Sequence, residues 1–272
     1  MKSRTDRTEA LLALIREGRQ MSLRQQLLLT ARLSIPSVLA QVSYMVMQYI
    51  DAAMVGSLGA DASASIGLVS TSTWLFWGVC TASATGFSVQ VAHHIGAGEF
   101  GRARSVLRQA FVATALFSIL LAAIGTSISG SLPRWLGGEE SIRHDASVYF
   151  FVFTLFLPAL QLNFLAGGML RCSGNMRVSS LLNVLMCALD VVFNFFLIFP
   201  SREWQWGGCS FTVPGAGLGV EGAALGTVTA ETIVAGLMVW YLCTRSKELA
   251  LNRERGSYRP VRHVLRKAVR IG

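Results

Sequence analysis

Charged residues are scarce in this chain: they make up 14% of its 272 residues, against roughly 25% in soluble domains. Hydrophobic residues reach 52% and the mean hydropathy is +0.49. These values exclude an ordinary soluble domain and indicate an integral membrane protein. The five cysteines form no CxxC pair and have no histidine at metal-binding spacing, which argues against a zinc site. Without a Ser/His or His/Glu constellation at membrane depth, an enzyme is the least favoured class.

Six long apolar runs make up most of the chain between residues 33 and 243. Each is about as long as the roughly 20 residues that cross a bilayer, and a backbone in lipid must satisfy its own hydrogen bonds, so we expect helices. The predicted fold is therefore an all-α integral membrane lobe of six transmembrane helices. It is preceded by a basic segment, 1–32, and followed by a basic segment, 244–272, whose last residues resemble the start of a seventh helix. The predicted spans are 33–58, 66–91, 109–131, 147–170, 178–199 and 219–243.

The basic residues are unevenly distributed between the two sides of the predicted spans. Of the 24 Lys and Arg residues, 21 lie in the two terminal segments and in the connections after the second and fourth spans. The other three, Arg134, Arg143 and Arg202, lie in connections on the opposite side. Basic residues mark cytoplasmic loops, so both termini are predicted to be cytoplasmic. The net charge of +9 is then a topology signal and a contact for anionic lipids, and not a nucleic-acid surface.

Polar side chains interrupt the first span at helical intervals. Gln41, Tyr44, Gln48 and Asp51 recur at steps of three or four residues, which places them on one helix face. Asp51 is the one charge in the run 33–59. A charge at such a depth costs roughly 2.5–3.5 kcal/mol on insertion scales and is a functional candidate by default.

The fifth and sixth spans carry matching polar groups. Asn183, Asp190 and Asn194 share a face of the fifth span, and Thr227 and Glu231 lie four residues apart on the sixth. Asp51, Asp190 and Thr227 lie about 10 to 14 Å below the predicted outer ends of their spans. If the helices are neighbours, they form one oxygen-rich site suited to Na⁺ or to trapping a proton. The candidate cation ligands are Asp51, Asp190, Asn194 and Thr227, and the candidate cavity-lining residues are Gln48, Asn183 and Glu231.

A purely structural interpretation exists for several of these groups. Amides and hydroxyls in membrane helices commonly form hydrogen bonds between helices, and this applies to Asn183 and Thr227 taken alone. Glu231 could equally face a polar cavity without chemistry. Pairing with a base does not explain Asp51 or Asp190, because no Lys or Arg lies in any predicted span.

Four motifs, in order along nearly the whole chain, resemble the multidrug and toxic compound extrusion (MATE) transporters. Asp51–Gly59 (DAAMVGSLG) is similar to the family's first-helix motif, and Leu170–Asn175 (LRCSGN) to its fourth-helix exit. Val91–Glu99 (VAHHIGAGE) is similar to the second-helix exit, with His93 where the family usually has Gln. Gly219–Thr227 (GVEGAALGT) is similar to the start of the sixth helix.

The resemblance implies a Na⁺- or H⁺-coupled antiporter of the plasma (inner) membrane that exports organic, often cationic, compounds and needs no cofactor beyond the coupling ion. It also implies a cation site from a first-helix Asp, matched by Asp51, and a sixth-helix Thr, matched by Thr227. A fifth-helix Asn/Asp pair completes the set. Here that pair is Asp190 and Asn194, in the reverse of the order associated with the family's prokaryotic members, which favours proton coupling.

The length of the sequence leads to three hypotheses about its function. The family has two six-helix lobes, and this sequence supplies one, so a homodimer or a separate second half would be needed to imitate a full transporter. A non-transporting membrane fragment or interaction protein is the second hypothesis. A related lipid-linked saccharide flippase is the third, and the lack of Arg or Lys in the predicted spans counts against it.

Overall fold

The computed structural model describes the chain except for residues 1–21, 207–208, 247, 252–257 and 259–260. The helices are α2 (Leu23–Gly56), α3 (Ala60–Gly96), α4 (Phe100–Ile128), α5 (Leu132–Trp135), α6 (Glu140–Leu155), α7 (Leu157–Cys172), α8 (Met176–Ile198), α9 (Gly219–Thr244) and α10 (Arg262–Ile271). Two strands, β1 (Pro200–Trp206) and β2 (Cys209–Ala216), pair as an antiparallel hairpin.

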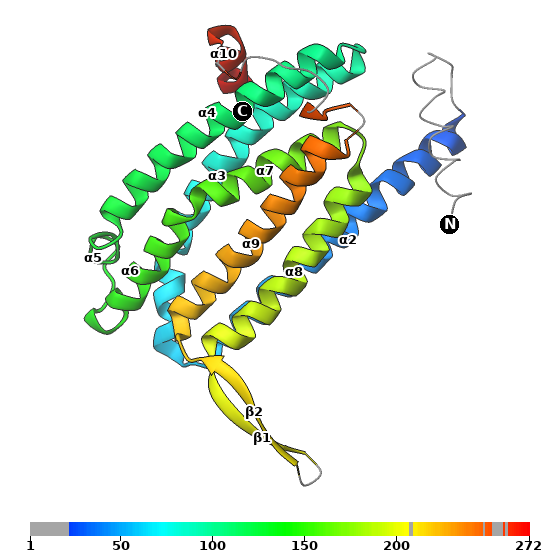
Figure 1. Ribbon diagram of the computed structural model, residues 1–272. Coiled ribbons are helices and arrows are strands. Elements are labelled where there is room, and N and C mark those ends of the chain that lie inside the picture. Colours follow the sequence, from blue (N-terminus) through cyan, green and yellow to red (C-terminus); the bar gives the residue numbers. More distant parts are fainter. Residues whose placement is uncertain (1–21, 207–208, 247, 252–257, 259–260) are drawn as a thin grey trace.

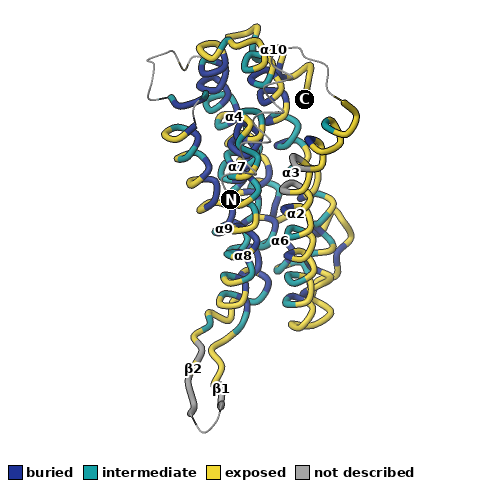
Figure 2. The backbone as a smooth tube through the Cα atoms, turned by 90° about the vertical axis from the view of Figure 1, so that its right-hand side faces the viewer, coloured by how far each residue is buried: buried dark blue, intermediate teal, exposed yellow. Residues whose placement is uncertain are grey.

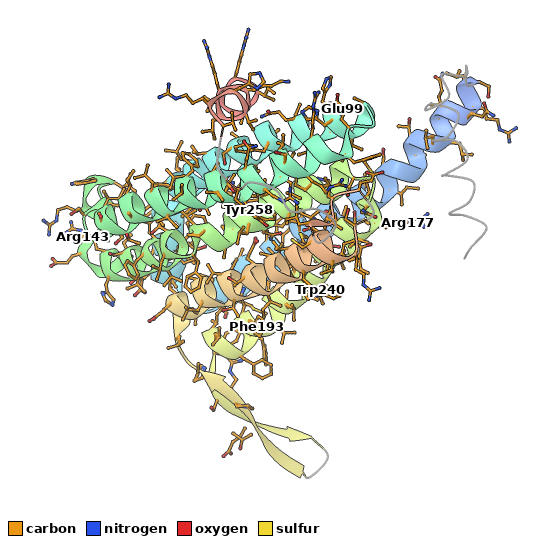
Figure 3. All side chains as sticks on the ribbon, turned by 45° about the horizontal axis from the view of Figure 1, so that its top comes forward. Glu99, Arg143, Arg177, Phe193, Trp240 and Tyr258 are labelled. Carbon is orange, nitrogen blue, oxygen red and sulfur yellow. The ribbon has the colours of Figure 1, made fainter. Side chains whose placement is uncertain are left out.

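The long helices run side by side as one bundle, with the hairpin projecting from one end (Figure 1). Five helices are long and apolar enough to cross a membrane, and α6 with α7 supplies a sixth, bent span. Glu99 and Arg177 lie towards one end of the bundle and Arg143 towards the other (Figure 3). These ends correspond to the sides that the sequence predicts to be cytoplasmic and outer, although the orientation itself stays a prediction.

The helices extend beyond the predicted spans. Ser22 caps α2, because its Oγ accepts from the backbone N–H of Gln25 while the Gln25 side chain accepts from the N–H of Ser22. This capping box starts the helix ten residues before the predicted span, so part of the segment predicted as polar and basic is helical. Likewise α4 begins at Phe100. Arg104 and Arg108, predicted in a loop, are therefore buried residues of that helix.

Glycines of two family-like motifs end α3 and α7. Gly98 and Gly174 have φ of 74° and 77°, a left-handed conformation that favours glycine. The N–H of Glu99 reaches back to the carbonyl of His94, and the N–H of Asn175 to that of Leu170, at 2.9 Å each. These hydrogen bonds end α3 and α7 with the same left-handed C-terminal cap. The next helices, α4 and α8, begin within two residues of each capping glycine.

Replacing Gly174 with alanine should lower the free energy of unfolding by about 1 kcal/mol, because alanine disfavours the left-handed conformation. The matched control is Gly78→Ala within α3, where φ is not positive and an added Cβ meets nothing within 4 Å. That control should leave stability unchanged or raise it. Denaturant titration of both variants in detergent measures the difference, and equal stabilities would contradict the cap assignment.

Glu99 precedes α4 in the turn after α3, outside the predicted spans. Nδ1 of His94 lies 2.8 Å from Oε2 of Glu99, and Nη1 of Arg102 donates to its Oε1 at 2.8 Å. The hydrogen bond with His94, aided by the bond and charge of Arg102, holds the pKa of Glu99 below its ordinary value. A carboxyl with a lowered folded pKa stabilises the protein above its ordinary pKa, and this contribution is lost as pH falls through the folded value.

We therefore expect Glu99→Gln to reduce the loss of folding stability that occurs as the pH falls through the acidic range. Thermal unfolding in detergent, followed from neutral pH to below the ordinary carboxyl pKa, should show a smaller decline than in the parent protein. Glu139→Gln, which removes the acid that precedes α6, is the control and should retain the parent's decline. An unchanged acid limb in Glu99→Gln would refute the contribution of this turn.

The fourth predicted span, 147–170, is two helices. The axes of α6 and α7 differ by 49°, and the break at Phe156 precedes Pro158 in the first turn of α7. Proline cannot donate a backbone hydrogen bond to the preceding turn, and its ring displaces the carbonyl there. The run predicted as one span is therefore one bent span, with its break next to Pro158.

The connection between α8 and α9 is a hairpin that the sequence analysis did not predict. The pairing runs from Pro200 opposite Ala216 to Trp206 opposite Cys209, with an irregularity between Pro200 and Arg202. An added Cβ at Gly215 would overlap the carbonyl of Phe199, so glycine is required where the strands leave the bundle. The guanidinium of Arg202 lies 4.3 Å from the centroid of the Phe199 ring.

The last helix, α10, lies against α3. The side-chain amide of Gln90 donates to the carbonyl of Val264 at 3.2 Å, and a Cβ on Gly86 would overlap the carbonyl of Ala268. A further bond runs from the N–H of Val261 to the side chain of Gln109 on α4 at 3.0 Å. The residues predicted as the approach to a seventh helix thus form a short helix packed on the bundle, close to the α3–α4 end (Figure 1).

The buried residues lie mainly between the helices of the bundle. Figure 2 shows the buried positions on the faces that the helices turn towards each other, and long exposed faces on α2. The largest cluster of buried side chains joins α3, α4, α7 and α9, with members such as Leu107, Leu165, Met169 and Met238. Large apolar residues on α2, including Val38, Val42 and Val46, are half exposed. This distribution is expected of helices that face lipid or another membrane-embedded surface.

Candidate functional site

Three of the four predicted cation ligands meet between α2 and α8. Nδ2 of Asn194 donates to Oδ1 of Asp51 at 2.9 Å and to Oδ2 of Asp190 at 3.2 Å. Asp190 and Asn194 are each 1% exposed, while Asp51 is only partly buried. One amide therefore bridges two carboxylates from different helices, and we call Asp51, Asp190 and Asn194 the carboxylate cluster.

The cluster holds oxygen atoms that lack donors. Among the described residues, Oδ1 of Asp190 and Oδ1 of Asn194 are buried without a hydrogen-bond partner. Buried polar atoms are nearly always hydrogen-bonded, so a cation or a proton would be stabilised at Oδ1 of Asp190, whereas Oδ1 of Asn194 packs against Gly226 of α9. Asp51 and Asp190 also interact electrostatically, and a cation between them would relieve that repulsion.

Thr227 joins the cluster from α9. Its side chain interacts with Asp190, although its hydroxyl also donates to the carbonyl of Ala223 at 3.1 Å. Close approach of α8 and α9 makes this contact possible, because a Cβ on Gly226 would overlap the side chain of Asn194. Tyr149 of α6 lines the same cavity as Thr227, and the sequence analysis did not single it out.

Glu231 forms a separate pair one turn further along α9. Nδ2 of Asn163 on α7 donates to Oε2 of Glu231, and Glu231 is 8% exposed. The sequence analysis missed Asn163. The signal was present, because Asn163 is an amide in the predicted span 147–170. Gln161, which donates to Ser83 of α3 at 3.0 Å, is a second buried amide in that span.

Two cavities flank Glu231, and its side chain lines both. The inner cavity, of about 390 Å³, lies between α2, α7, α8 and α9 and includes Gln41, Arg171 and Asn183 in its lining. The outer cavity, of about 350 Å³, includes Gln48, Tyr149 and Thr227. All three predicted cavity-lining residues, Gln48, Asn183 and Glu231, therefore line one or both cavities, and Thr227 connects the outer cavity to the carboxylate cluster.

The candidate donor set has two carboxylates and two neutral groups, an amide and a hydroxyl. In the described part of the chain, no three His, Cys, Asp or Glu side chains group closely enough to hold a metal ion. Two carboxylates, an amide and a hydroxyl instead suit a singly charged cation, because a site rich in acids would be needed for a tightly held divalent ion.

A bundle of membrane-length helices, with buried carboxylates and cavities between them, defines a multi-pass membrane protein of the transporter type. The sequence comparison then gives the family: residues 36–196 match the MatE family model, and the chain belongs to this family. Members of the family are transporters and not enzymes, and they are multi-pass proteins of the plasma membrane.

Curated relatives are similar over most of this chain. A Streptococcus pneumoniae protein named "Probable multidrug resistance protein NorM" is 26% identical over 235 residues, which are 86% of this chain and 49% of that protein. A Shewanella oneidensis protein named "FAD transporter" is 22% identical over 244 residues, 87% of this chain and 51% of that protein. The chain thus spans about half the length of the relatives that it matches.

Solved structures share the fold. A MOP superfamily transporter from Pyrococcus furiosus superposes with a TM-score of 0.73 at 21% identity, over 89% of this chain and 50% of that one. The outward-facing conformation of a multidrug resistance MATE family transporter gives a TM-score of 0.72 at 21% identity, over 88% and 50% of the two chains. The architecture is therefore that of one MATE-like lobe.

Proposed function

We propose that this chain is the cation-coupled lobe of an antiporter that exports organic, often cationic, compounds by alternating access, with H⁺ or Na⁺ as the coupling ion. The observation that carries the proposal is the carboxylate cluster, in which one amide bridges Asp51 and Asp190. The buried Oδ1 of Asp190, which has no hydrogen-bond donor among the described residues, supports the binding of a coupling cation.

The coupling ion acts by neutralising charge. With the cluster empty and both carboxylates charged, Asp51 and Asp190 would repel each other across the α2–α8 contact. A bound proton or Na⁺ removes that repulsion, so occupancy changes the energy of the α2–α8 interface by an amount set by the differential binding. Asp51, Asp190, Asn194 and Thr227 are the proposed ligands. The proposal covers either ion, because carboxylate and amide oxygens coordinate Na⁺ and a carboxylate by itself binds H⁺.

The organic substrate is proposed to enter the cavities. Their volumes of about 390 and 350 Å³ fall within the 300–1,000 Å³ that is usual for small-molecule sites. Tyr44 and Trp77 line both, as does Glu231. Aromatic faces beside a carboxylate attract organic cations.

A complete transport cycle is proposed to involve a second six-helix body, either another copy of this chain or a separate half. The half-exposed apolar residues of α2 provide a surface for it, and membrane lipids cover the remaining apolar faces.

Reconstitution of the chain in proteoliposomes tests the proposal. Export of a fluorescent organic cation is measured under an imposed H⁺ gradient and, separately, an imposed Na⁺ gradient. We expect gradient-dependent export, and we expect Asp51→Asn to lower its initial rate by about tenfold or more, because a neutral side chain cannot exchange charge with the ion. The control is Glu221→Gln, which removes an exposed acid in the first turn of α9.

Each outcome has a distinct meaning. Dependence on one gradient identifies the coupling ion. Export that persists unchanged in Asp51→Asn would overturn the assigned cluster. Absence of export from folded protein, both alone and with a second MatE lobe added, would favour a non-transporting membrane protein.

A further inference from the structure

The last helix, α10, carries its basic residues on one side. Arg262, Arg266 and Arg270 recur every four residues, and Lys267 lies beside them. Positions four apart are neighbours on a helix surface, so the three guanidinium groups follow one another over about 12 Å of the helix axis. All four residues are exposed. We call Arg262, Arg266, Lys267 and Arg270 the basic face of α10.

The opposite side of α10 is apolar and packs on the bundle. Ala268 is a member of the main hydrophobic cluster, and Val264 and Leu265 pack against that cluster. These contacts fix the rotation of α10 about its own axis, so the basic face is turned away from the bundle. In Figure 3 the nitrogen-tipped side chains of this helix extend away from the other helices.

Contacts with α3 set the level at which α10 lies. The side-chain amide of Gln90 donates to the carbonyl of Val264, and eight residues further along α10 a Cβ on Gly272 would overlap the carbonyl of Ala82. Gln90 lies at the end of the predicted span 66–91, and Ala82 lies eight residues further inside it. The helix α10 therefore begins level with the end of that span and follows it for about 12 Å. The basic face thus lies where the headgroup layer of a bilayer would meet the protein.

No described carboxylate neutralises the basic face. Residues 261–272 contain no Asp or Glu, and within the described ranges no ion pair joins the basic face to an acid. Glu99, in the turn after α3, is already held by His94 and Arg102. The positive charge of this face is therefore complemented only by an anionic group from outside the described part of the chain.

We propose that the basic face of α10 binds the headgroup phosphates of anionic phospholipids, in the leaflet on the side predicted to be cytoplasmic. Anionic lipids of the cytoplasmic leaflet attract basic residues next to a membrane helix. The long side chains of Arg and Lys place their charge among headgroups while their aliphatic stems stay in apolar surroundings. The sequence analysis assigned the net charge of the chain to lipids only in general, whereas this inference assigns a lipid contact to four residues of one helix.

A layer of headgroups fits this face better than a single soluble anion does. The basic residues lie on the outside of a helix, and none of them lines either of the two cavities described above. A soluble phosphate would reach only part of a row that is about 12 Å long, and it would stay exposed to water. Lipids present several phosphates at once, and their acyl chains would cover Val269, which is 83% exposed on the same helix.

Lipid enrichment in detergent measures this binding directly. The purified full chain is mixed in a neutral detergent with equal amounts of phosphatidylglycerol and phosphatidylcholine that carry the same acyl chains. The protein is recovered by affinity chromatography, and the retained lipids are quantified by mass spectrometry. We expect the parent protein to retain mainly phosphatidylglycerol. The triple variant Arg262→Gln, Arg266→Gln and Arg270→Gln should lower the ratio of the two retained lipids by about fivefold or more, because each basic residue near the membrane surface adds to the attraction.

Two matched variants separate the basic face from net charge. The dispersed variant Arg24→Gln, Arg134→Gln and Arg245→Gln removes the same three charges from exposed positions on α2, on α5 and at the end of α9. It should keep the parent's lipid ratio within about twofold, because the row of charges on α10 is intact. Lysine at the three arginine positions of α10 should retain most of the preference, since the charge remains while the paired donors are lost.

A variant of α3 tests the position of α10 without changing any charge. A Cβ on Gly86 would already overlap the carbonyl of Ala268, so Gly86→Leu should displace α10 and lower the lipid ratio by about twofold or more, as expected when a close contact is overpacked. The control is Gly78→Leu on the same helix, where a Cβ meets nothing within 4 Å. It should retain the parent's ratio.

The outcomes that would overturn the inference are specific. The first is a lipid ratio that is unchanged in the glutamine variant, and the second is an equal loss in the dispersed variant. The third is loss of the preference when inorganic phosphate is added at a concentration matching that of the lipid, which would indicate a site for a soluble anion. If the glutamine variant is less stable than the parent in lipid-free detergent, the lysine and Gly86→Leu variants decide the question. Because no gradient or substrate is involved, the result is independent of the proposed transport function.

Discussion

Replacing Asn194 with leucine will lower the free energy of unfolding by roughly 3 kcal/mol, the scale expected when a buried charged group loses its hydrogen-bond donor. The single amide of Asn194 serves Asp51 and Asp190 at once. Leucine has a similar volume but no donor, so the two carboxylates would face each other without a bridge. Denaturant titration in detergent provides the measurement.

A second variant separates loss of the bridge from loss of packing. In Asp190→Leu with Asn194→Leu, the buried carboxylate that needed the donor is also gone, and Asp51 is only partly buried. Replacing a whole buried polar set by apolar residues is often neutral, so the double variant should recover most of the lost stability. If the double variant is as unstable as Asn194→Leu alone, the defect is one of shape and the bridging role is wrong.

Gly226→Ala should disrupt the site from the opposite side, through α9. An added Cβ would overlap the side chain of Asn194, and overpacking of a close contact costs about 1–3 kcal/mol. Because the displaced group is the bridge itself, we also expect gradient-dependent export to fall by tenfold or more, at roughly 1.4 kcal/mol per tenfold.

Gly236→Ala is the matched control on the same helix. A Cβ there meets nothing within 4 Å, so alanine should leave export unchanged and raise stability slightly through its higher helix propensity. Equal behaviour of the two alanine variants, in stability and in export, would contradict a close α8–α9 contact at Asn194.

Much of the site was accessible from sequence because membrane helices restrict where polar residues can lie. Asp51, Asp190 and Asn194 were grouped by face and depth, and the structure brings these three together. Periodicity could not show that Asn194 donates to both acids, since that depends on the rotation of α8 against α2. Nor could it place Asn163 on Glu231, a contact between residues 68 positions apart.

The misses in the fold have different physical origins. Pro158 marked a place where the fourth span could kink, but hydropathy gives neither the angle nor the division into two helices at Phe156. The hairpin was missed because the connection of 200–216 was considered only as a link between spans. Arg171 was misjudged because a span ends where apolar character ends, whereas a helix continues to its cap at Ser173.

The hairpin gives the three site helices unequal freedom. Strands β1 and β2 continue directly from α8 and into α9, and their hydrogen-bonded ladder fixes these two helices to each other at one end. Asp190, Asn194, Thr227 and Glu231 are therefore carried on one stiff unit. The hydrogen bond from Asn194 to Asp51 joins that unit to α2. Its strength depends on whether the carboxyl of Asp51 is ionised. In the proposed cycle, ion exchange would therefore act on the contact between α2 and α8, while α8 and α9 stay joined by the hairpin.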